Sequence, residues 1–405
     1  MSLDKWLNGK IVTSKVSSET QDKGNARRAS ASSREENSLS NSPSRKKPKV
    51  ESFIFKSGIT SPRSHHVSET IYSLACFKKS AHYAIGLEGK GLEIRKCSDT
   101  NSLENETMWS DPTFSNDPIE DMIVNVNDSL LYTSNDSISV IYSSGTLERY
   151  RFNKNYAVDG FATRIAIPDS HPELLAAGTT NGTVHLIDLR EKMHSDPKVF
   201  KNMHAVTTGP KAQRLYPQIS ALAWIDGFRL ATGNNVYGSM KLWDIRMPKK
   251  SAISQTCLSK SPINSICAGN GMIYALSRNS EVHVLESLDL TKDWSYSNSD
   301  ILKVNSLKPQ IDLLPNNTVA IGGCNGLSLF QQTKETNESL DRTVESTEKC
   351  SFKGKWDLIK DEDCVTSKDC LRSEISVVKY HSFARQLLAT DTNKVLLYSI
   401  PPSDV

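Results

Sequence analysis

The sequence lacks any apolar run long enough to cross a membrane. Of its 405 residues, 37% are hydrophobic, and no stretch approaches the roughly 18 consecutive apolar residues that a spanning helix requires. The segment from Met1 to Trp6 has no apolar signal-peptide core, and the first arginine is Arg27. We therefore expect no membrane protein, and neither a secreted protein nor one with a mitochondrial presequence.

Cysteine motifs and catalytic motifs are also missing. The eight cysteines include no C-x-x-C pair and no histidine at zinc-finger spacing, which argues against a structural zinc site or a disulfide framework. There is no P-loop, dinucleotide fingerprint, G-x-S-x-G elbow or H-E-x-x-H motif. His65 and His66 lie in an expected linker without a further ligand, and the glycines of 86–91 fit a hairpin turn between two strands. We expect no enzyme, no cofactor and no metal.

Charge is distributed unevenly along the chain. The formal net charge is +3, but residues 1–66 carry +7 and the remainder carries −4. From residue 12 to about residue 50 the chain is Ser, Lys, Arg, Glu and Asn, with too little apolar surface to offset the entropy of ordering. We predict a disordered basic tail over residues 1–52. The mildly acidic body is not primarily a nucleic-acid binder, although direct nucleic-acid contact stays open.

The body of the sequence repeats one pattern. Each unit has an alternating apolar strand, a strand of small residues and a third alternating strand, separated by turns. Seven such units span 71–96, 119–142, 161–190, 219–246, 263–285, 304–330 and 375–400. This order is typical of four-stranded propeller blades, whereas a β-sandwich does not repeat at this period. We predict an all-β fold, a seven-bladed β-propeller over residues 53–402, with a polar insert at about 333–372.

Two units carry specific motifs, the runs Leu242-Trp243-Asp244 and Asn181 to Asp188. On these residues the body resembles the WD-repeat β-propeller family. Only one unit has the Trp-Asp pair, and Met203-His204 is the nearest counterpart of the Gly-His that usually opens a repeat. The resemblance implies a partner-binding scaffold in which most blades lack the family's His, Ser/Thr, Asp and Trp network and depend on apolar packing. Because a closed propeller needs an N-terminal strand to complete its last blade, we expect Phe53-Ile54-Phe55 to supply it.

The tail carries a compact cluster of cations. Arg45, Lys46, Lys47 and Lys49 fall within five residues and resemble a monopartite nuclear import signal, which implies an import receptor as partner and a nuclear protein, with shuttling to the cytoplasm left open. The alternative is a solvated charge run. Ser42 resembles a proline-directed phosphorylation site and Ser30 a basophilic one. A phosphate on Ser42 would add about −1.5 to −2 charge beside the cations and weaken binding to an acidic groove.

The first residues form a second motif. Leu3, Trp6 and Leu7 are spaced i, i+3, i+4, so one helical turn places them on one face, and Gly9 can end that turn. The run resembles the PIP box that binds the sliding clamp (PCNA), although Leu7 stands where a second aromatic residue is usual. Docking to another groove and no docking role are the alternatives.

Two equivalent blade ends share an Asp-x-Arg sequence. Asp188 with Arg190, and Trp243-Asp244 with Arg246, resemble the double box of propellers that serve as cullin–RING ubiquitin ligase receptors. The resemblance implies that Asp188 and Asp244 cap turns while the two arginines contact an adaptor, and an ordinary blade turn is the alternative. The polar insert, with an acidic patch at 361–363, is either a solvated loop with an outer strand at 355–359 or a partner surface.

These features favour a non-enzymatic nuclear scaffold at chromatin that acts in DNA replication or repair, with the tail binding a partner such as the clamp. A substrate receptor of a cullin–RING ligase is the first alternative. An RNA-processing or ribosome-assembly scaffold is the second, because the import signal suits it equally well.

Overall fold

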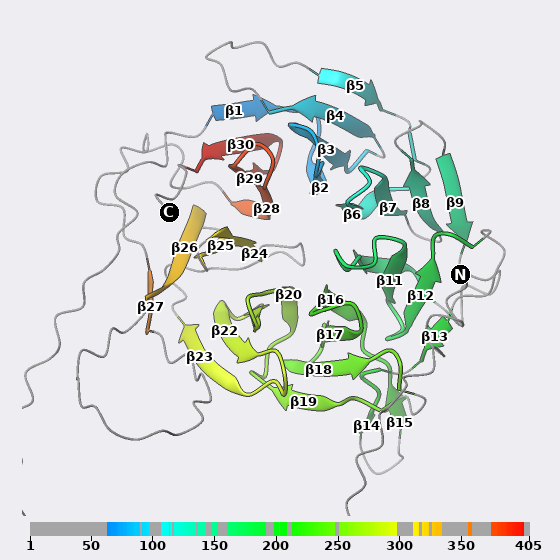
Figure 1. The fold of residues 1–405 in the computed structure, drawn as a ribbon, viewed down its shortest axis with the longest axis vertical. Helices are drawn as coiled ribbons and strands as arrows, with labels where there is room; N and C mark the ends of the chain where they lie inside the picture. Colours follow the sequence, from blue (N-terminus) through cyan, green and yellow to red (C-terminus); the bar gives the residue numbers. More distant parts are fainter. Residues whose placement is uncertain are drawn as a thin grey trace, which may run out of the picture.

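The computed structural model contains a ring of β-sheets (Figure 1). It describes residues 63–89, 91–97, 107–112, 114–115, 117–134, 137–142, 147–151, 160–191, 198–201, 203–208, 213–247, 251–297, 311–315, 318–323, 326–333, 355–358 and 374–400. These residues contain seven four-stranded antiparallel sheets and no α-helix. The prediction of an all-β, seven-bladed propeller is confirmed.

The blades follow one another along the chain, each running from an inner to an outer strand. Blade one has β2 (Ile71–Cys76), β3 (His82–Leu87), β4 (Leu92–Lys96) and β5 (Thr107–Asp111). Blade two has β6 (Ile119–Val124), β7 (Leu130–Ser134), β8 (Ser137–Ile141) and β9 (Leu147–Arg151). Blade three has β10 (Ala162–Ala166), β11 (Leu174–Thr179), β12 (Val184–Asp188) and β13 (Lys198–Phe200). Blade four has β16 (Ile219–Trp224), β17 (Arg229–Asn234), β18 (Ser239–Asp244) and β19 (Ser254–Cys257).

The remaining three blades keep the same order. Blade five has β20 (Ile263–Gly269), β21 (Met272–Ser277), β22 (Glu281–Glu286) and β23 (Lys292–Ser297). Blade six has β24 (Ile311–Leu314), β25 (Thr318–Gly323), β26 (Gly326–Thr333) and β27 (Lys355–Leu358). Blade seven has β28 (Ile375–His381), β29 (Gln386–Asp391), β30 (Lys394–Ser399) and, as its outer strand, β1 (Arg63–His66). A separate hairpin, β14 (Val206–Thr208) with β15 (Gln213–Leu215), lies between blades three and four in the chain.

The small residues of the second strands have a packing reason. A β-carbon added to Gly178 would lie 2.6 Å from Ile219, and one added to Gly233 would lie 2.8 Å from Ile263. Each isoleucine is the first residue of the inner strand of the next blade. Glycine therefore lets consecutive blades approach closely, which a larger residue would prevent.

Side-chain hydroxyls join neighbouring blades near the same places. Thr163 in blade three donates a hydrogen bond to the carbonyl oxygen of Ile219 in blade four at 2.8 Å, and Ser73 in blade one donates to that of Ile119 in blade two at 2.8 Å. Both hydroxyls come from inner strands at a shift of the β-ladder register. The blades are thus joined by polar contacts as well as by the apolar packing that the sequence predicts.

The strand that closes the ring differs from the expected one. Arg63–His66, and not Phe53-Ile54-Phe55, pairs with β30, with Ser64 opposite Leu396. An outer strand faces solvent on the ring's circumference, so a polar segment suits it better than an apolar one. His65 is consequently part of a strand and not of a linker, and its Nδ1 lies 2.7 Å from the hydroxyl of the buried Tyr83. Residues 53–55 lie outside the described residues.

Three further sequence predictions concern blades one and six, and the structure confirms two of them. The glycine-containing segment of 86–91 joins β3 to β4 as a hairpin, and the predicted outer strand at 355–359 is β27, which pairs with β26. The first strand of blade six begins at Ile311, whereas the sequence suggested Val304, which lies outside the described residues. Pro315 directly follows this short strand and lacks the N–H needed to extend the ladder.

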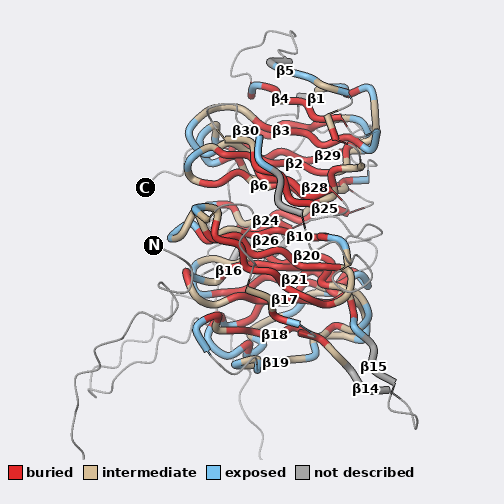
Figure 2. Tube along the Cα trace, turned by 90° about the vertical axis from the view of Figure 1, so that its right-hand side faces the viewer, coloured by how far each residue is buried: buried red, intermediate tan, exposed pale blue. Residues whose placement is uncertain are grey.

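The core lies between the blades, and the loops gather at two edges. In Figure 2 the buried segments run through the middle of the disc and exposed residues mark both of its edges. No helix in the described part of the chain is long and apolar enough to cross a membrane.

Candidate protein-interaction surface

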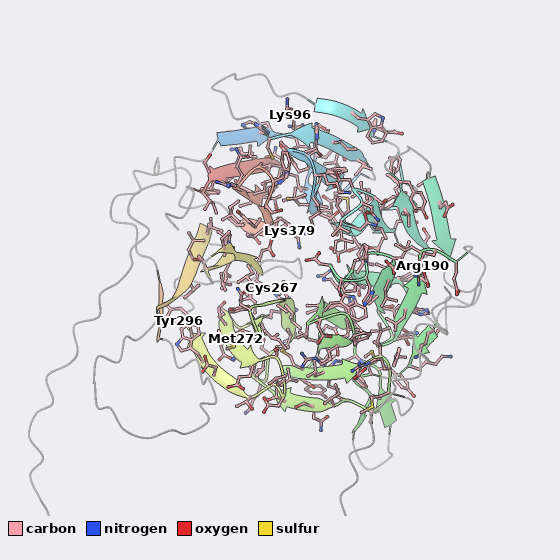
Figure 3. All side chains as sticks on the ribbon, viewed as in Figure 1. Lys96, Arg190, Cys267, Met272, Tyr296 and Lys379 are labelled. Atoms are coloured by element: carbon pink, nitrogen blue, oxygen red, sulfur yellow. The ribbon has the colours of Figure 1, made fainter. Side chains whose placement is uncertain are left out.

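The connections between strands define two rims. In every antiparallel blade the turn between the first and second strands and the end of the third strand lie at one edge, and the turn between the second and third strands lies at the opposite edge. We call the first edge the arginine rim, because Arg190 and Arg246 follow β12 and β18 there, and the second edge the opposite rim. The two Asp-x-Arg boxes leave the ring at the same edge in neighbouring blades, and Figure 3 marks Arg190 in blade three.

Arg190 folds back onto the aspartate that ends its own strand. Its backbone N–H donates to Asp188 Oδ1 at 3.0 Å, while Nε and Nη2 donate to Oδ1 and Oδ2 at 2.8 and 2.6 Å. Its Nη1 lies 3.3 Å from a carboxylate oxygen of Glu173. The hydrogen bonds that Arg190 donates to the Asp188 carboxylate are the main reason that the pKa of Arg190 is raised. Two carboxylates therefore hold this guanidinium.

Arg246 makes the same contacts to Asp244 but has a different neighbour. Its backbone N–H and Nε each donate to Asp244 Oδ1 at 2.9 Å, and Nη2 donates to Oδ2 at 2.6 Å. These bonds lower the pKa of the Asp244 carboxyl and raise that of the guanidinium. The guanidinium carbon lies 4.3 Å from the ring centroid of Phe228, a cation–π contact. No second carboxylate within ion-pair distance of Arg246 is found in the part of the chain that the structure describes.

The two arginines consequently differ in what they offer a partner. Both side chains are about two-fifths exposed. Arg190 is bound by both Asp188 and Glu173. Arg246 is stacked on an aromatic ring, and its bonds to Asp244 use Nε and Nη2 but not Nη1. Arg246 is the better placed of the two to form a new hydrogen bond.

Trp243 supports this rim from inside the blade. The sequence motif placed Trp243 with the arginines in the adaptor-docking site. Trp243 is only 5% exposed, so it offers little surface to a partner. Its Nε1 donates to Thr232 Oγ1 at 2.9 Å. It holds β18 against β17 and so positions the turn in which Arg246 lies.

A buried hydrogen-bond network surrounds Thr232. His204 Nε2 lies 2.8 Å from Thr232 Oγ1, and His204 Nδ1 lies 3.1 Å from the side-chain nitrogen Nδ2 of Asn234. Burial, followed by the nearby Lys241, lowers the pKa of His204 to about 3, so the ring is neutral at physiological pH. Blade four thus contains the His, Thr and Trp part of the WD-repeat network, with Asn234 beside His204. The Met203-His204 pair that the sequence offered only as a counterpart forms part of it.

Blade three lacks that network. Ile187 occupies the place of Trp243, and Thr179 Oγ1 instead lies 2.6 Å from Asn181 Oδ1 and 3.1 Å from the Thr183 carbonyl oxygen. The turn of this blade is held by local bonds, while Ile187 packs into the apolar core.

Sequence reasoning missed two residues of the arginine rim. Glu173 and Phe228 come from the turns that lead into the second strands of their blades. They contact Arg190 and Arg246 because those turns share an edge with the third-strand ends. Neither residue belongs to the Asp-x-Arg motif, so only its position within the repeat could have identified it from the sequence.

The predicted tail sites lie outside the described residues. These are the docking set Leu3, Trp6 and Leu7, the import cluster Arg45, Lys46, Lys47 and Lys49, and the serines Ser30 and Ser42. Within the described ranges, no group of three or more His, Cys, Asp or Glu side chains could hold a metal ion.

Solved structures share the fold at low sequence identity. The β-propeller domain of Myceliophteria thermophila Cps50 (Swd1) has a TM-score of 0.59 and 13% identity, covering 84% of this chain and 99% of that one. A chain of the mitotic checkpoint complex has a TM-score of 0.58 and 14% identity, covering 91% of this chain and 99% of that one. At this identity the likeness shows a WD40-like propeller fold. No curated protein sequence matches this chain.

A family model gives a more specific assignment. The model described as nucleolar protein 10-like, N-terminal domain, a β-propeller, matches residues 127–338. That span runs from blade two to the end of β26 in blade six and includes both Asp-x-Arg boxes. Because it covers more than half of the 405 residues, the chain belongs to the nucleolar protein 10-like N-terminal domain family of WD-repeat β-propellers.

Proposed function

We propose that this protein is a non-enzymatic propeller scaffold of the nucleolus that binds partner proteins during ribosome assembly. The observation that carries the proposal is the match of residues 127–338 to the nucleolar protein 10-like family. The nucleolus is the compartment in which ribosomal subunits are assembled. The proposal therefore favours the ribosome-assembly hypothesis over the chromatin hypothesis with which the sequence began.

The geometry supports a scaffold because the Asp-x-Arg boxes and the buried network of blade four have their polar groups paired. At the end of β12 Arg190 binds Asp188, and at the end of β18 Arg246 binds Asp244. His204 is neutral and buried. Catalytic groups, by contrast, are usually placed so that they can exchange protons or electrons with a substrate. Rigid turns around a closed ring instead present fixed surfaces to partners.

The test combines location, partners and ribosomal RNA processing. A C-terminally tagged full chain should concentrate in the nucleolus, and its purification should recover pre-ribosomal proteins. Depletion should cause precursor ribosomal RNA to accumulate in pulse labelling. A diffuse nuclear or cytoplasmic signal, together with unchanged precursor RNA after depletion, would refute the proposal.

A second candidate, receptor of a cullin–RING ubiquitin ligase, is favoured by one specific observation. Asp188 with Arg190, and Asp244 with Arg246, form matching capped turns on one rim of adjacent blades. Because Arg246 is held by one carboxylate and Arg190 by two, Arg246→Ala should weaken adaptor recovery more than Arg190→Ala. The exposed Arg278 on the opposite rim provides the control, because Arg278→Ala should leave the recovery of the adaptor unchanged. Recovery of adaptor and cullin that is equal in all variants would exclude this docking site.

The tail motifs provide separate tests. Clamp binding predicts that Trp6→Ala abolishes recovery of the sliding clamp, and the import signal predicts that Lys46→Ala with Lys47→Ala leaves the protein in the cytoplasm. If the clamp is recovered from wild type and lost with Trp6→Ala, the replication and repair role regains support. If the clamp is absent from wild type, that role has no remaining argument.

A further inference from the structure

The opposite rim of blades three and four carries a strip of uncharged residues. We call it the neutral strip and define it as residues 160–161, 180–183, 216–218 and 235–238. It includes three large apolar side chains that face solvent: Phe161 and Tyr216, each 44% exposed, and Val236, 40% exposed. They come from the segments before β10 and β16 and from the turn after β17, all at the same edge.

The four segments of the strip touch one another. The Thr180 N–H donates to the Phe161 carbonyl oxygen at 2.9 Å. A β-carbon added to Gly182, whose φ is +72°, would lie 2.7 Å from the carbonyl oxygen of Pro217. The Asn235 N–H donates to the Gln218 carbonyl oxygen at 3.2 Å. The strip is therefore one continuous surface across two blades.

The backbone fixes the exposed side chains in place. The Phe161 N–H also donates to Thr180 Oγ1 at 3.0 Å. The N–H groups of Val236 and Tyr237 both donate to Asn234 Oδ1, at 3.0 and 2.8 Å, and Asn234 itself is buried. A partner would meet a preformed surface, so little conformational entropy would be lost from this side on binding.

The strip's composition indicates the chemistry of its partner. None of its residues is Asp, Glu, Lys, Arg or His, whereas binding a nucleic-acid backbone depends on lysine and arginine near the phosphates. Aromatic and aliphatic side chains on the strip suit apolar anchors. The amide side chains of Gln218 and Asn235 bind each other, with Asn235 Nδ2 donating to Gln218 Oε1 at 3.2 Å. An uncharged polypeptide segment complements this surface.

A β-hairpin stands beside the strip. Tyr216 of the strip directly follows Leu215, the last residue of β15. Its two strands pair with each other, and neither has another neighbour among the described strands. An unpaired strand edge can accept an extended segment by main-chain hydrogen bonds.

We propose that the neutral strip and the adjacent hairpin edge bind an extended, uncharged segment of a partner protein that carries two or more apolar side chains. Alternate residues of such a segment point to the same side, so apolar residues at i and i+2 would reach the strip while the main chain lies along the hairpin. This site lies on the rim away from Arg190 and Arg246 and does not depend on the proposed nucleolar function.

The test selects ligands with a random dodecapeptide library displayed on phage, using the immobilised full chain. Enriched peptides should be uncharged, with apolar residues at alternate positions. Fluorescein-labelled copies should bind the triple variant Phe161→Ser, Tyr216→Ser and Val236→Ser at least tenfold more weakly than the wild type. The matched control, Met247→Ser, Leu288→Ser and Phe383→Ser, removes three exposed apolar residues elsewhere and should bind normally. Circular dichroism and thermal midpoints establish that both variants fold.

The opposing outcomes are distinct. Failure to enrich peptides, enrichment of charged ones, or equal binding by the strip variant and the wild type would overturn the proposal. Binding of a labelled oligouridylate that the strip variant loses would identify an RNA surface instead. Self-association in sedimentation, lost in the strip variant, would identify a second copy of the chain as the occupant.

Discussion

Thr232 is the residue on which the buried network of blade four depends. Its hydroxyl accepts from Trp243 Nε1 and lies within hydrogen-bond distance of His204 Nε2. Thr232→Val keeps the shape of the side chain but leaves both partners buried without it. We expect a loss of about 2–4 kcal/mol in the free energy of unfolding, because each unsatisfied buried polar group costs roughly 1–3 kcal/mol. Denaturant unfolding followed by tryptophan fluorescence measures this change.

A matched substitution in the same blade separates the network from the general effect of threonine loss. Thr256 lies in β19 opposite Met240 and is partly exposed. Thr256→Val should change the free energy of unfolding by less than about 0.5 kcal/mol, as is usual for surface substitutions. Equal losses in the two variants would show that the Thr232 bonds contribute nothing specific.

Buried histidines should also make stability depend on pH. Burial is the main cause that lowers the pKa of His204 from 6.5 to about 3 and that of His283 to about 4. Below pH 6.5 the unfolded chain binds protons that the folded protein does not, so stability is fully present above that pH and is lost toward pH 3. Each histidine contributes a slope of about 1.4 kcal/mol per pH unit within that window. His204→Gln should reduce the slope measured between pH 6 and pH 4, and an unchanged slope would contradict this assignment.

Local spacing explains which residues of the arginine rim were predictable. Asp188 and Arg190 are two positions apart, so their pairing is encoded within one turn. Glu173 and Phe228 reach the same rim only because each blade folds back on itself. No periodicity in the sequence marks them as contacts, and they could be found only after the strands were in register.

At the scale of the element, β1 decides whether the ring closes. It pairs with β30, and Arg95 Nη1 donates to the His66 carbonyl oxygen at 3.0 Å. Replacing both Ser64 and His65 with proline removes two successive N–H groups, one of which points toward the neighbouring strand. We expect a loss of about 1–3 kcal/mol in the free energy of unfolding, the cost of leaving a polar group of the ladder unpaired, measured by chemical denaturation of the full chain.

The control for ring closure uses the strand that the sequence suggested. Phe53→Pro with Ile54→Pro should leave the free energy of unfolding unchanged, because the place beside β30 is taken by Arg63–His66. If this pair of substitutions destabilised the protein and the Ser64 and His65 pair did not, the closing strand would be wrongly assigned.

The elements differ in how far the sequence determines them. Inner strands such as β16 are almost wholly buried and appear as apolar runs, and the small residues of β17 follow from the approach of Gly233 to Ile263. Outer strands have no such constraint. β19 alternates between partly and fully exposed positions, so composition does not distinguish it from a loop. For the same reason the polar β1 was not recognised, whereas the more apolar Phe53-Ile54-Phe55 was.

At the scale of the whole molecule, the charge of the chain is divided between two parts. Residues 1–66 carry +7 and the remainder carries −4, so the proposed function in ribosome assembly predicts that the protein contacts RNA through its N-terminal cations. Replacing Arg45, Lys46, Lys47 and Lys49 with alanine should weaken binding of the full chain to single-stranded RNA. The slope of log K against log salt concentration should become shallower by about 3, because each neutralised phosphate contributes about 0.7 for single strands. Fluorescence anisotropy over a salt series measures this slope.

The control replaces four exposed cations of the propeller and should leave the slope unchanged. These are Lys78, Lys79, Lys260 and Arg278. A control that flattens the slope as much as the tail variant would mean that the propeller itself holds the RNA.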